Sequence, residues 1–324
     1  MKKCLAMMLA VVLLLGTLVG CASGKDTAGS DDGRIRIVTT VFPAYDWVKN
    51  ILGNEPDNIE LTWLLDEGVD MHSYQPSMED ILTISTCDLF VCVGGESDRW
   101  ADEVLKNALN KEMTVVRLLE VLGDAARVEE TVEGMQIEND AGDESEEYDE
   151  HVWLSLRNAM SLVETLSKTL QELDPPKAEE YAVNAAAYVE KMQSLETRYQ
   201  KAVDEASVRT LLFGDRFPFR YMTEDYGLSY YAAFSGCSAE TEASFEIITF
   251  LSGKADELGL HTILKTEGSD GKIAETVVQN TESKDLKVLT LDSMQSVTGK
   301  QAEDGATYLS VMENNLSILT EAME

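Results

Sequence analysis

The chain has 324 residues, of which 59 are acidic and 26 basic, and its formal net charge at pH 7 is −33. An excess of negative charge this large excludes a general affinity for nucleic acid or anionic lipid, and it favours solubility and the attraction of cations. The charge alone does not locate a cation site.

The first 20 residues resemble a secretory signal. Two lysines precede an apolar run over 5–18 that is too short for a permanent membrane span. The following Leu18-Val19-Gly20-Cys21 resembles a bacterial lipobox, in which the cysteine becomes the lipid-modified first residue of the mature protein; an ordinary signal peptide with a chance cysteine is the alternative. We therefore expect 21–33 to be a lipidated Cys21 and a flexible tether. Such an anchor holds the protein at the outer face of the cell membrane, the periplasmic side if there are two membranes.

Beyond the tether, strands and helices are predicted to alternate. Strands are expected over 34–40, 59–65, 89–93 and 114–117, with helices over 42–52, 78–85 and 100–107 between them. This alternation predicts a parallel sheet covered by helices on both faces. We interpret 34–173 as an N-terminal α/β lobe. It contains an acidic stretch, 129–150, with eleven carboxylates in 22 residues and almost no apolar periodicity, which predicts a disordered or mobile loop.

A helical section and a second α/β segment follow. An amphipathic helix over 156–173 ends at Asp174-Pro175-Pro176, and 178–207 shows apolar residues at helical intervals over about 45 Å. Strands are then expected over 210–214, 230–233, 262–265 and 288–291, with helices over 221–226, 245–253, 272–279 and from Tyr308 onward. The predicted fold is α/β, with two lobes of parallel sheet covered by helices, 34–173 and 208–324, joined by one long helix within 174–207.

The cysteines argue against a disulfide framework. With Cys21 acylated, Cys87, Cys92 and Cys237 remain as an odd number of thiols in an exported chain. Cys87 and Cys92 lie in an apolar, strand-like stretch and are expected to be small core residues.

Two of the three histidines stand in compact strings at the edges of predicted elements. His72 lies in Met71-His72-Ser73-Tyr74-Gln75-Pro76, and His151 lies in Asp149-Glu150-His151-Val152-Trp153-Leu154. Imidazole is the commonest side-chain ligand for zinc and several neighbouring metals, so one shared metal site is the hypothesis. The alternative for each is a buried structural histidine. His261, beside a predicted strand without a partner motif, is interpreted as structural.

The order of these strings is similar to that in a known family. The lipobox, Val38-Thr39-Thr40-Val41-Phe42-Pro43, the two histidine segments, Asp225-Tyr226-Gly227-Leu228, Thr241-Glu242-Ala243-Ser244, Thr266-Glu267 and Leu289-Thr290-Leu291-Asp292 resemble the metal-binding solute-binding lipoproteins of ABC transporters, the zinc and manganese class. The resemblance covers nearly all of the mature chain. It implies a receptor with two lobes linked by a rigid helix, a metal in the cleft between them, and delivery to a membrane permease with a separate ATPase. A monomer is expected.

The resemblance also implies one metal ligand from each of four loops that face the cleft. His72 and His151 match the two ligands of the first lobe, and Asp292 matches the carboxylate of the second. The remaining position departs from the family pattern, because counting back from Tyr226 puts Arg216 where His or Glu is usual, and Arg stays protonated. We predict the adjacent Asp215 as the third ligand. Cys237, Glu240 and Glu242 remain alternatives.

Two histidines with one or two carboxylates suit tetrahedral zinc and also higher-coordinate manganese. We favour Zn²⁺ over Mn²⁺, because zinc receptors of this class often carry a His- and acid-rich loop before the second histidine, although the loop here contains no histidine. Affinity is expected to fall as protons compete for the histidines. A metallohydrolase is the main rival class, but the chain lacks a helical His-Glu-x-x-His motif and we expect no enzyme. Arg216 keeps open a surface adhesion lipoprotein with a degenerate metal site.

Overall fold

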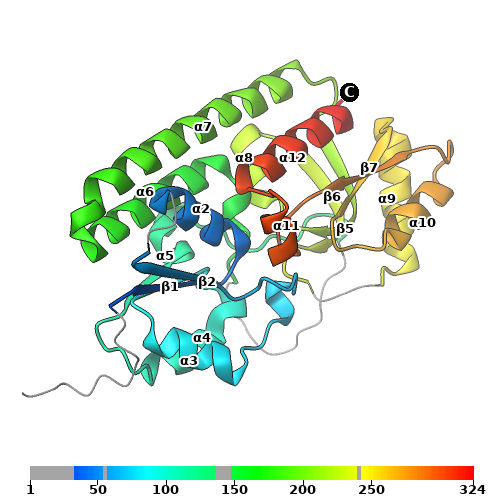
Figure 1. Ribbon diagram of the computed structural model, residues 1–324. Helices are drawn as coiled ribbons and strands as arrows, with labels where there is room; N and C mark the ends of the chain where they lie inside the picture. The colour runs from blue at the N-terminus through cyan, green and yellow to red at the C-terminus, as the bar shows by residue number, and fades with distance from the viewer. Residues whose placement is uncertain (1–32, 54–56, 136–146, 239–241) are drawn as a thin grey trace, which may run out of the picture. The chain divides into compact units, whose positions relative to one another are not determined.

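The computed structural model describes residues 33–53, 57–135, 147–238 and 242–324 (Figure 1). The predicted signal, Cys21 and nearly all of the tether therefore lie outside the described residues, as do Glu240 and the middle of the acidic stretch. Residues 33–324 form one compact unit. Within the described ranges, no helix has the length and apolar character needed to cross a membrane.

The first lobe is built on a four-stranded parallel sheet with the strand order β2-β1-β3-β4. Its strands are β1 (Ile35–Thr39), β2 (Ile59–Trp63), β3 (Leu89–Cys92) and β4 (Thr114–Arg117), and its helices are α2 (Phe42–Leu52), α3 (Met78–Thr86), α4 (Arg99–Lys106) and α5 (Leu118–Leu122). Successive residues of β3 point to opposite faces: Leu89 and Val91 join the cluster around α2, and Phe90 and Cys92 join the cluster with α3 and α4. Both faces are covered, which is why the strand reads as a continuous apolar run.

The second lobe repeats this arrangement with the order β6-β5-β7-β8. Its strands are β5 (Thr210–Phe217), β6 (Ser229–Ser235), β7 (Thr262–Thr266) and β8 (Lys287–Leu291), and its helices are α8 (Arg220–Tyr226), α9 (Phe245–Leu258), α10 (Lys272–Asn280), α11 (Gly299–Glu303) and α12 (Tyr308–Ala322). All described strand pairs are parallel. One face of the sheet packs against α9 and α10, and the other packs toward α12.

Two long helices, α6 (Leu156–Leu173) and α7 (Ala178–Glu205), complete the fold. Figure 1 shows α7 running alongside α6 and α2 and then past α12. The hydroxyl of Tyr188 donates to Asp46 on α2 at 2.8 Å, and the hydroxyl of Tyr199 donates to the carbonyl of Met312 on α12 at 2.6 Å. Helix α7 is therefore bonded to elements of both lobes, and the predicted α/β fold with a joining helix is confirmed.

The departure from the predicted elements that bears on the candidate ligands concerns β5. We predicted this strand over 210–214, but it continues to Phe217, and its register with β6 shifts between Phe213 and Arg216. A β-bulge of this kind lets a strand pass through a polar sequence that resembles a loop. Asp215 and Arg216 are consequently strand residues near the carboxyl end of the sheet.

The described ends of the acidic stretch are paired with each other. Val128 and Tyr148 form an antiparallel bridge, and the backbone nitrogen of Glu129 donates to the carbonyl of Glu147 at 2.7 Å. This pairing fixes the approach of the chain to His151, and the residues predicted to be mobile at the centre of the stretch lie outside the described part of the chain.

Candidate metal centre

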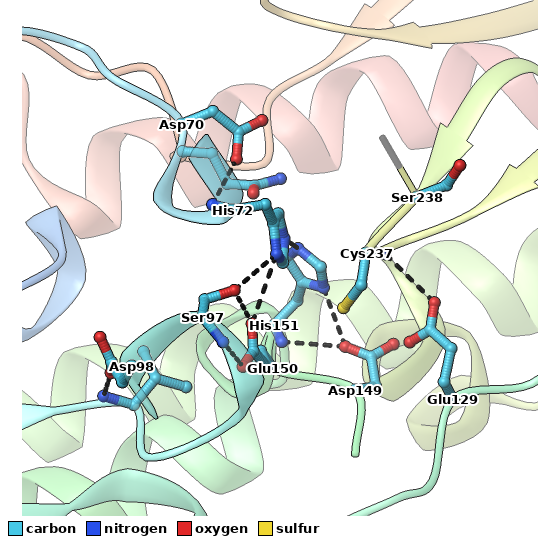
Figure 2. A network of polar contacts seen from close by, with 12 residues as sticks. Asp70, His72, Ser97, Asp98, Glu129, Asp149, Glu150, His151, Cys237 and Ser238 are labelled. Carbon is cyan, nitrogen blue, oxygen red and sulfur yellow. Dashed lines mark hydrogen bonds and ion pairs between the residues drawn. The ribbon is translucent and has the colours of Figure 1, made fainter. Parts of the chain in front are cut away.

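The two predicted histidines, 79 residues apart in the sequence, face each other (Figure 2). His72 lies on the 3₁₀ turn η1 (Met71–Ser73) after β2, and His151 precedes the turn η4 (Val152–Leu154) that leads into α6. Their Nε2 atoms are 3.2 Å apart and their ring centroids 5.2 Å apart. His151 is completely buried, at 0% exposure.

Hydrogen bonds on the far side of each ring fix which nitrogen carries a proton. The Nδ1 atom of His151 is 2.9 Å from Oδ1 of Asp149, so this nitrogen donates to the carboxylate. The Nδ1 atom of His72 is 2.8 Å from Oγ of Ser97, and that hydroxyl in turn donates to Oε2 of Glu150. Because Ser97 donates onward, it accepts from His72. Both rings thus hold a proton on Nδ1 and direct Nε2 toward the other ring, as metal-binding histidines do.

The two histidines differ in their affinity for a second proton. Burial, followed by the nearby charge of His151, lowers the pKa of His72 to about 3. Burial alone would also lower the pKa of His151, but the carboxylates around it, led by Asp149, outweigh burial and raise the pKa. Of the two imidazoles, His151 is therefore the one that accepts a second proton more readily. A cation bound between the two Nε2 atoms would compete with that proton.

The side chain of Glu150 lies close to the backbone of the turn after β3. A Cβ added to Gly95 would lie only 2.0 Å from Oε1 of Glu150, so any larger residue there would displace this side chain. The same carboxylate oxygen accepts the backbone N–H of Ser97 at 2.8 Å. Neither Ser97 nor Glu150 was predicted from the sequence as a partner of the histidines. The glycine pair Gly94-Gly95 after β3 was the available signal for a crowded turn.

Cys237 is the third residue of the cluster. One potential ligand atom each from His72, His151 and Cys237 lies within 4.8 Å of the other two. Cys237 follows β6, and its backbone nitrogen donates to Oε1 of Glu129 at 3.2 Å. Burial, and then the charges of Glu129 and other carboxylates, raise the pKa of its thiol well above the ordinary value.

The structure does not bring Asp215 into this cluster. Its Oδ2 atom accepts hydrogen bonds from the backbone nitrogen and the hydroxyl of Thr266, both at 2.9 Å, and its Oδ1 atom accepts from the backbone nitrogen of Arg216 at 2.8 Å. The carboxylate therefore joins the ends of β5 and β7. Because both of its oxygens already accept hydrogen bonds within the second lobe, Asp215 stabilises the sheet edge.

Arg216 connects the second lobe to the turn that carries His72. Its Nη2 atom is 2.6 Å from Oδ2 of Asp70, and Oδ1 of Asp70 accepts the backbone N–H of His72 at 3.0 Å. Burial alone would raise the pKa of Asp70, but the charge of Arg216 outweighs it and holds the pKa below the usual range. Arg216, which stands where the family usually has His or Glu, thus forms an ion pair next to the histidines.

Asp292 lies after β8, outside the three-residue cluster formed by the described side chains. Its Oδ1 atom accepts from the backbone nitrogen of Met294 at 2.8 Å. Burial and the charge of Glu267 raise the pKa of Asp292 to about 6. Glu267 itself accepts hydrogen bonds from Ser293 and from the backbone of Gln295, so it organises the loop that follows Asp292.

The remaining histidine and the remaining described candidate lie outside the cluster. Glu242 and His261 are exposed and do not belong to the cluster, and Glu240 falls outside the described ranges. Cys87 and Cys92 are fully buried free thiols in the core of the first lobe, as predicted.

Comparison with known proteins identifies relatives over nearly the whole described chain. The family model ZnuA, "Zinc-uptake complex component A periplasmic", matches residues 37–322. The "Zinc-binding protein AdcA" of Streptococcus pyogenes is 30% identical over 295 residues, covering 89% of this chain and 56% of that protein. The "Zinc-binding lipoprotein AdcA" of Streptococcus pneumoniae is 32% identical over 330 residues, covering 100% of this chain and 62% of the relative. The chain thus spans less than two thirds of the length of these relatives.

Solved structures show the same fold. The Zn(II)-bound ZnuA-like domain of Streptococcus pneumoniae AdcA superimposes with a TM-score of 0.70 and 28% identity, covering 90% of this chain and 99% of that one. A mutant of the laminin-binding adhesin Lmb of Streptococcus agalactiae superimposes with a TM-score of 0.72 at 23% identity and covers 90% of this chain and 100% of the other, which is a likeness of fold.

Proposed function

The chain belongs to the ZnuA family of zinc-uptake components, and on that premise we propose that it is an extracytoplasmic receptor that binds zinc and delivers it to the permease of an ABC transporter. The curated relatives carry zinc-binding names, and one is called a lipoprotein. The permease and the ATPase that powers it are separate proteins in this proposal. The receptor is a monomer that a lipid on Cys21 holds at the outer face of the membrane. Its working parts are the lobes 34–173 and 208–324 and the helical link 174–207.

The observation that carries the proposal is the distance between the two histidine nitrogens. Zinc binds imidazole nitrogen at about 2.0–2.1 Å, and at a tetrahedral angle two such nitrogens lie about 3.3 Å apart. The Nε2 atoms of His72 and His151 are 3.2 Å apart. With Nδ1 of each ring bonded to a partner, both nitrogens present lone pairs at the spacing that one zinc ion requires.

We propose His72 and His151 as ligands, with Asp292 as the carboxylate that the second lobe offers. The raised pKa of Asp292 supports this role, because a carboxylate destabilised by burial and by a neighbouring acid gains from a bound cation. Asp215 is not carried into the proposal, since both of its oxygens hold the β5 and β7 edge together.

Manganese is the second candidate cargo, because a site of histidine and carboxylate also accepts it. Manganese favours oxygen ligands, whereas the cluster around His151 presents two nitrogens and one sulfur. This favours zinc. The ion pair of Arg216 with Asp70 leaves the histidine pair intact, so the arginine does not by itself support a degenerate site. No enzymatic role is proposed.

A calorimetric titration of chelator-buffered zinc into the metal-stripped protein tests the proposal. We expect one-to-one binding with a dissociation constant below about 1 μM. His72→Ala should abolish this binding, and His261→Ala should leave it unchanged, because His261 is exposed and lies outside the cluster. Multi-site weak binding that His72→Ala does not alter would contradict the receptor function and indicate that only the acidic stretch attracts ions.

A further inference from the structure

We propose that Cys237 is a zinc ligand in addition to His72, His151 and Asp292, and that its thiolate makes the receptor selective for thiophilic divalent ions, such as zinc and cadmium, over manganese. This inference rests on the proposed metal-receptor function. It assigns the chain a ligand that the pattern of its family did not predict.

The position of Cys237 follows from the pairing of two neighbouring strands. In the parallel pair β5 and β6, Arg216 stands opposite Phe234 and Phe217 opposite Ser235. Cys237 follows two residues beyond Ser235, so it lies at the same carboxyl edge of the sheet as Arg216. A ligand missing from the end of β5 is thus available from the end of β6.

Arg216, which occupies the position where the family usually has His or Glu, contacts groups other than the histidines. Arg216 pairs with Asp70 at 2.6 Å, and its Nη1 atom is 3.4 Å from the carbonyl of Ser238. The guanidinium therefore bridges the turn that carries His72 and the loop that carries Cys237. This contact holds the two loops together while the arginine itself supplies no lone pair.

The loop that carries Cys237 is closely fitted to the histidine pair. A Cβ added to Gly236 would lie 3.2 Å from Cε1 of His151 and 2.9 Å from the carbonyl of Phe217, so a larger residue would force this loop away. On the other side, Glu129 accepts the backbone N–H of Cys237. Figure 2 shows the sulfur of Cys237 on the side of the loop that faces His151. Gly236 and Glu129 thus hold the loop in which the Cys237 sulfur lies within 4.8 Å of one ring nitrogen of each histidine.

The chemistry of the three atoms selects the ion. When zinc binds, a Zn–S bond forms, the S–H bond breaks, and the proton leaves to solvent, so the thiolate offsets one of the two positive charges. A set of two imidazoles and one thiolate is softer than two imidazoles with carboxylates, and it disfavours manganese. Cys87 and Cys92 are buried in the core of the first lobe and lie outside the cluster, so Cys237 alone among the described cysteines has this role.

Cobalt(II) provides a direct optical test, because it occupies zinc sites and shows a sulfur-to-metal charge-transfer absorption when a thiolate is bound. We expect the metal-stripped full-length protein to develop this absorption with one equivalent of cobalt. Cys237→Ser should remove the absorption and weaken zinc binding about 100-fold, as the loss of one of few ligands does. Cys87→Ala, which removes a buried thiol far from the histidines, should retain both properties. The thermal unfolding midpoint of each variant shows whether that variant is folded. The charge-transfer absorption of the unaltered protein tests the thiolate ligand without relying on any variant.

Two results would overturn the inference in different ways. Cobalt or zinc binding that needs His72, shows no charge transfer and is unchanged in Cys237→Ser would leave a receptor whose ligands exclude the thiol. Absence of one-to-one binding in the unaltered protein would contradict the receptor function itself, and the proposed ligand with it.

Discussion

The loops at the carboxyl edges of the two sheets contribute to the candidate metal centre in different ways. In the first lobe, each histidine has its Nδ1 atom fixed by a second side chain, and these partners are themselves hydrogen-bonded. In the second lobe, Asp215 and Glu267 use their oxygens to bond loops of their own sheet, and Arg216 is paired with Asp70. The edge of the first lobe presents nitrogen lone pairs, whereas most polar side chains named at the edge of the second lobe are used in hydrogen bonds or ion pairs.

This difference separates the parts of a binding site that a short sequence string predicts from the parts that depend on the fold. Asp149 lies only two residues from His151, so one short string contains both a candidate ligand and the side chain that orients it. A ligand from the second lobe depends on strand register, on the bulge in β5 and on which residues are already bonded. The first kind of contact can be predicted from a short stretch of sequence, and the second has to be seen in the structure.

The strongest test of the comparison removes the two imidazoles of the first lobe. His72→Ala and His151→Ala should each reduce zinc affinity by about 1000-fold or more, because each removes a ligand from a preformed pair. His261→Ala should bind zinc as the unaltered protein does. Competition against a zinc-sensitive dye measures the zinc affinity of all three variants. A His72→Ala variant that still binds zinc would show that the second lobe holds the metal.

A smaller loss is expected when a partner of an imidazole is altered and the ligand is kept. Asp149→Asn retains a side-chain oxygen but removes the charge that orients and polarises His151, and such changes cost about 10-fold to 100-fold in metal affinity. The matched control is Asp256→Asn, because Asp256 is an exposed carboxylate on α9 that accepts the backbone N–H of Glu282 and lies outside the cluster. Equal affinities of Asp149→Asn and the unaltered protein would mean that the first edge is not preorganised by this contact.

Acidification should weaken zinc binding through His151. Its pKa is raised above the ordinary 6.5, so the ring keeps its proton to a higher pH than an isolated imidazole, and zinc must displace that proton. Affinity should therefore fall by up to about tenfold per pH unit below this raised pKa. In Asp149→Asn the fall should begin at lower pH, because the leading carboxylate that raises the pKa is gone. Titrations at a series of pH values measure both curves, and identical curves would contradict the assignment.

The smallest effect on zinc is expected in the second lobe at Asp215. Asp215→Asn should leave zinc affinity within about threefold, yet it should lower the free energy of unfolding by about 1–3 kcal/mol, because the amide cannot accept all three hydrogen bonds of the carboxylate. Denaturant unfolding together with a zinc titration separates the two effects. A variant of normal stability that no longer binds zinc would restore Asp215 as a ligand.

Much of the fold could be predicted because its strands are covered on both faces. Continuous apolar runs such as Leu89-Phe90-Val91-Cys92 stand out between polar turns, and their alternation with helical patterns indicates parallel sheets. The end of β5 could not be predicted in this way. Asp215 and Arg216 resemble a loop in sequence, but the strand continues through them with a shift in its register against β6.

The candidate site was predictable to the extent that its residues are local. The sequence indicated His72 and His151 by their strings, but Ser97 and Glu150 act through contacts between separate loops, for which no spacing rule exists. Cys237 was only one of several alternatives, since its distance from the histidines depends on how the second sheet packs on the first lobe.

The most direct measurement is the anomalous scattering of zinc in a crystal of the zinc-loaded protein. We predict one peak about 2.0–2.1 Å from both Nε2 atoms of His72 and His151, with the contacts of Asp149 and Ser97 to these rings unchanged. A peak on the acidic stretch, or one bonded only to carboxylates of the second lobe, would contradict the account that a preformed histidine pair of the first lobe captures the metal.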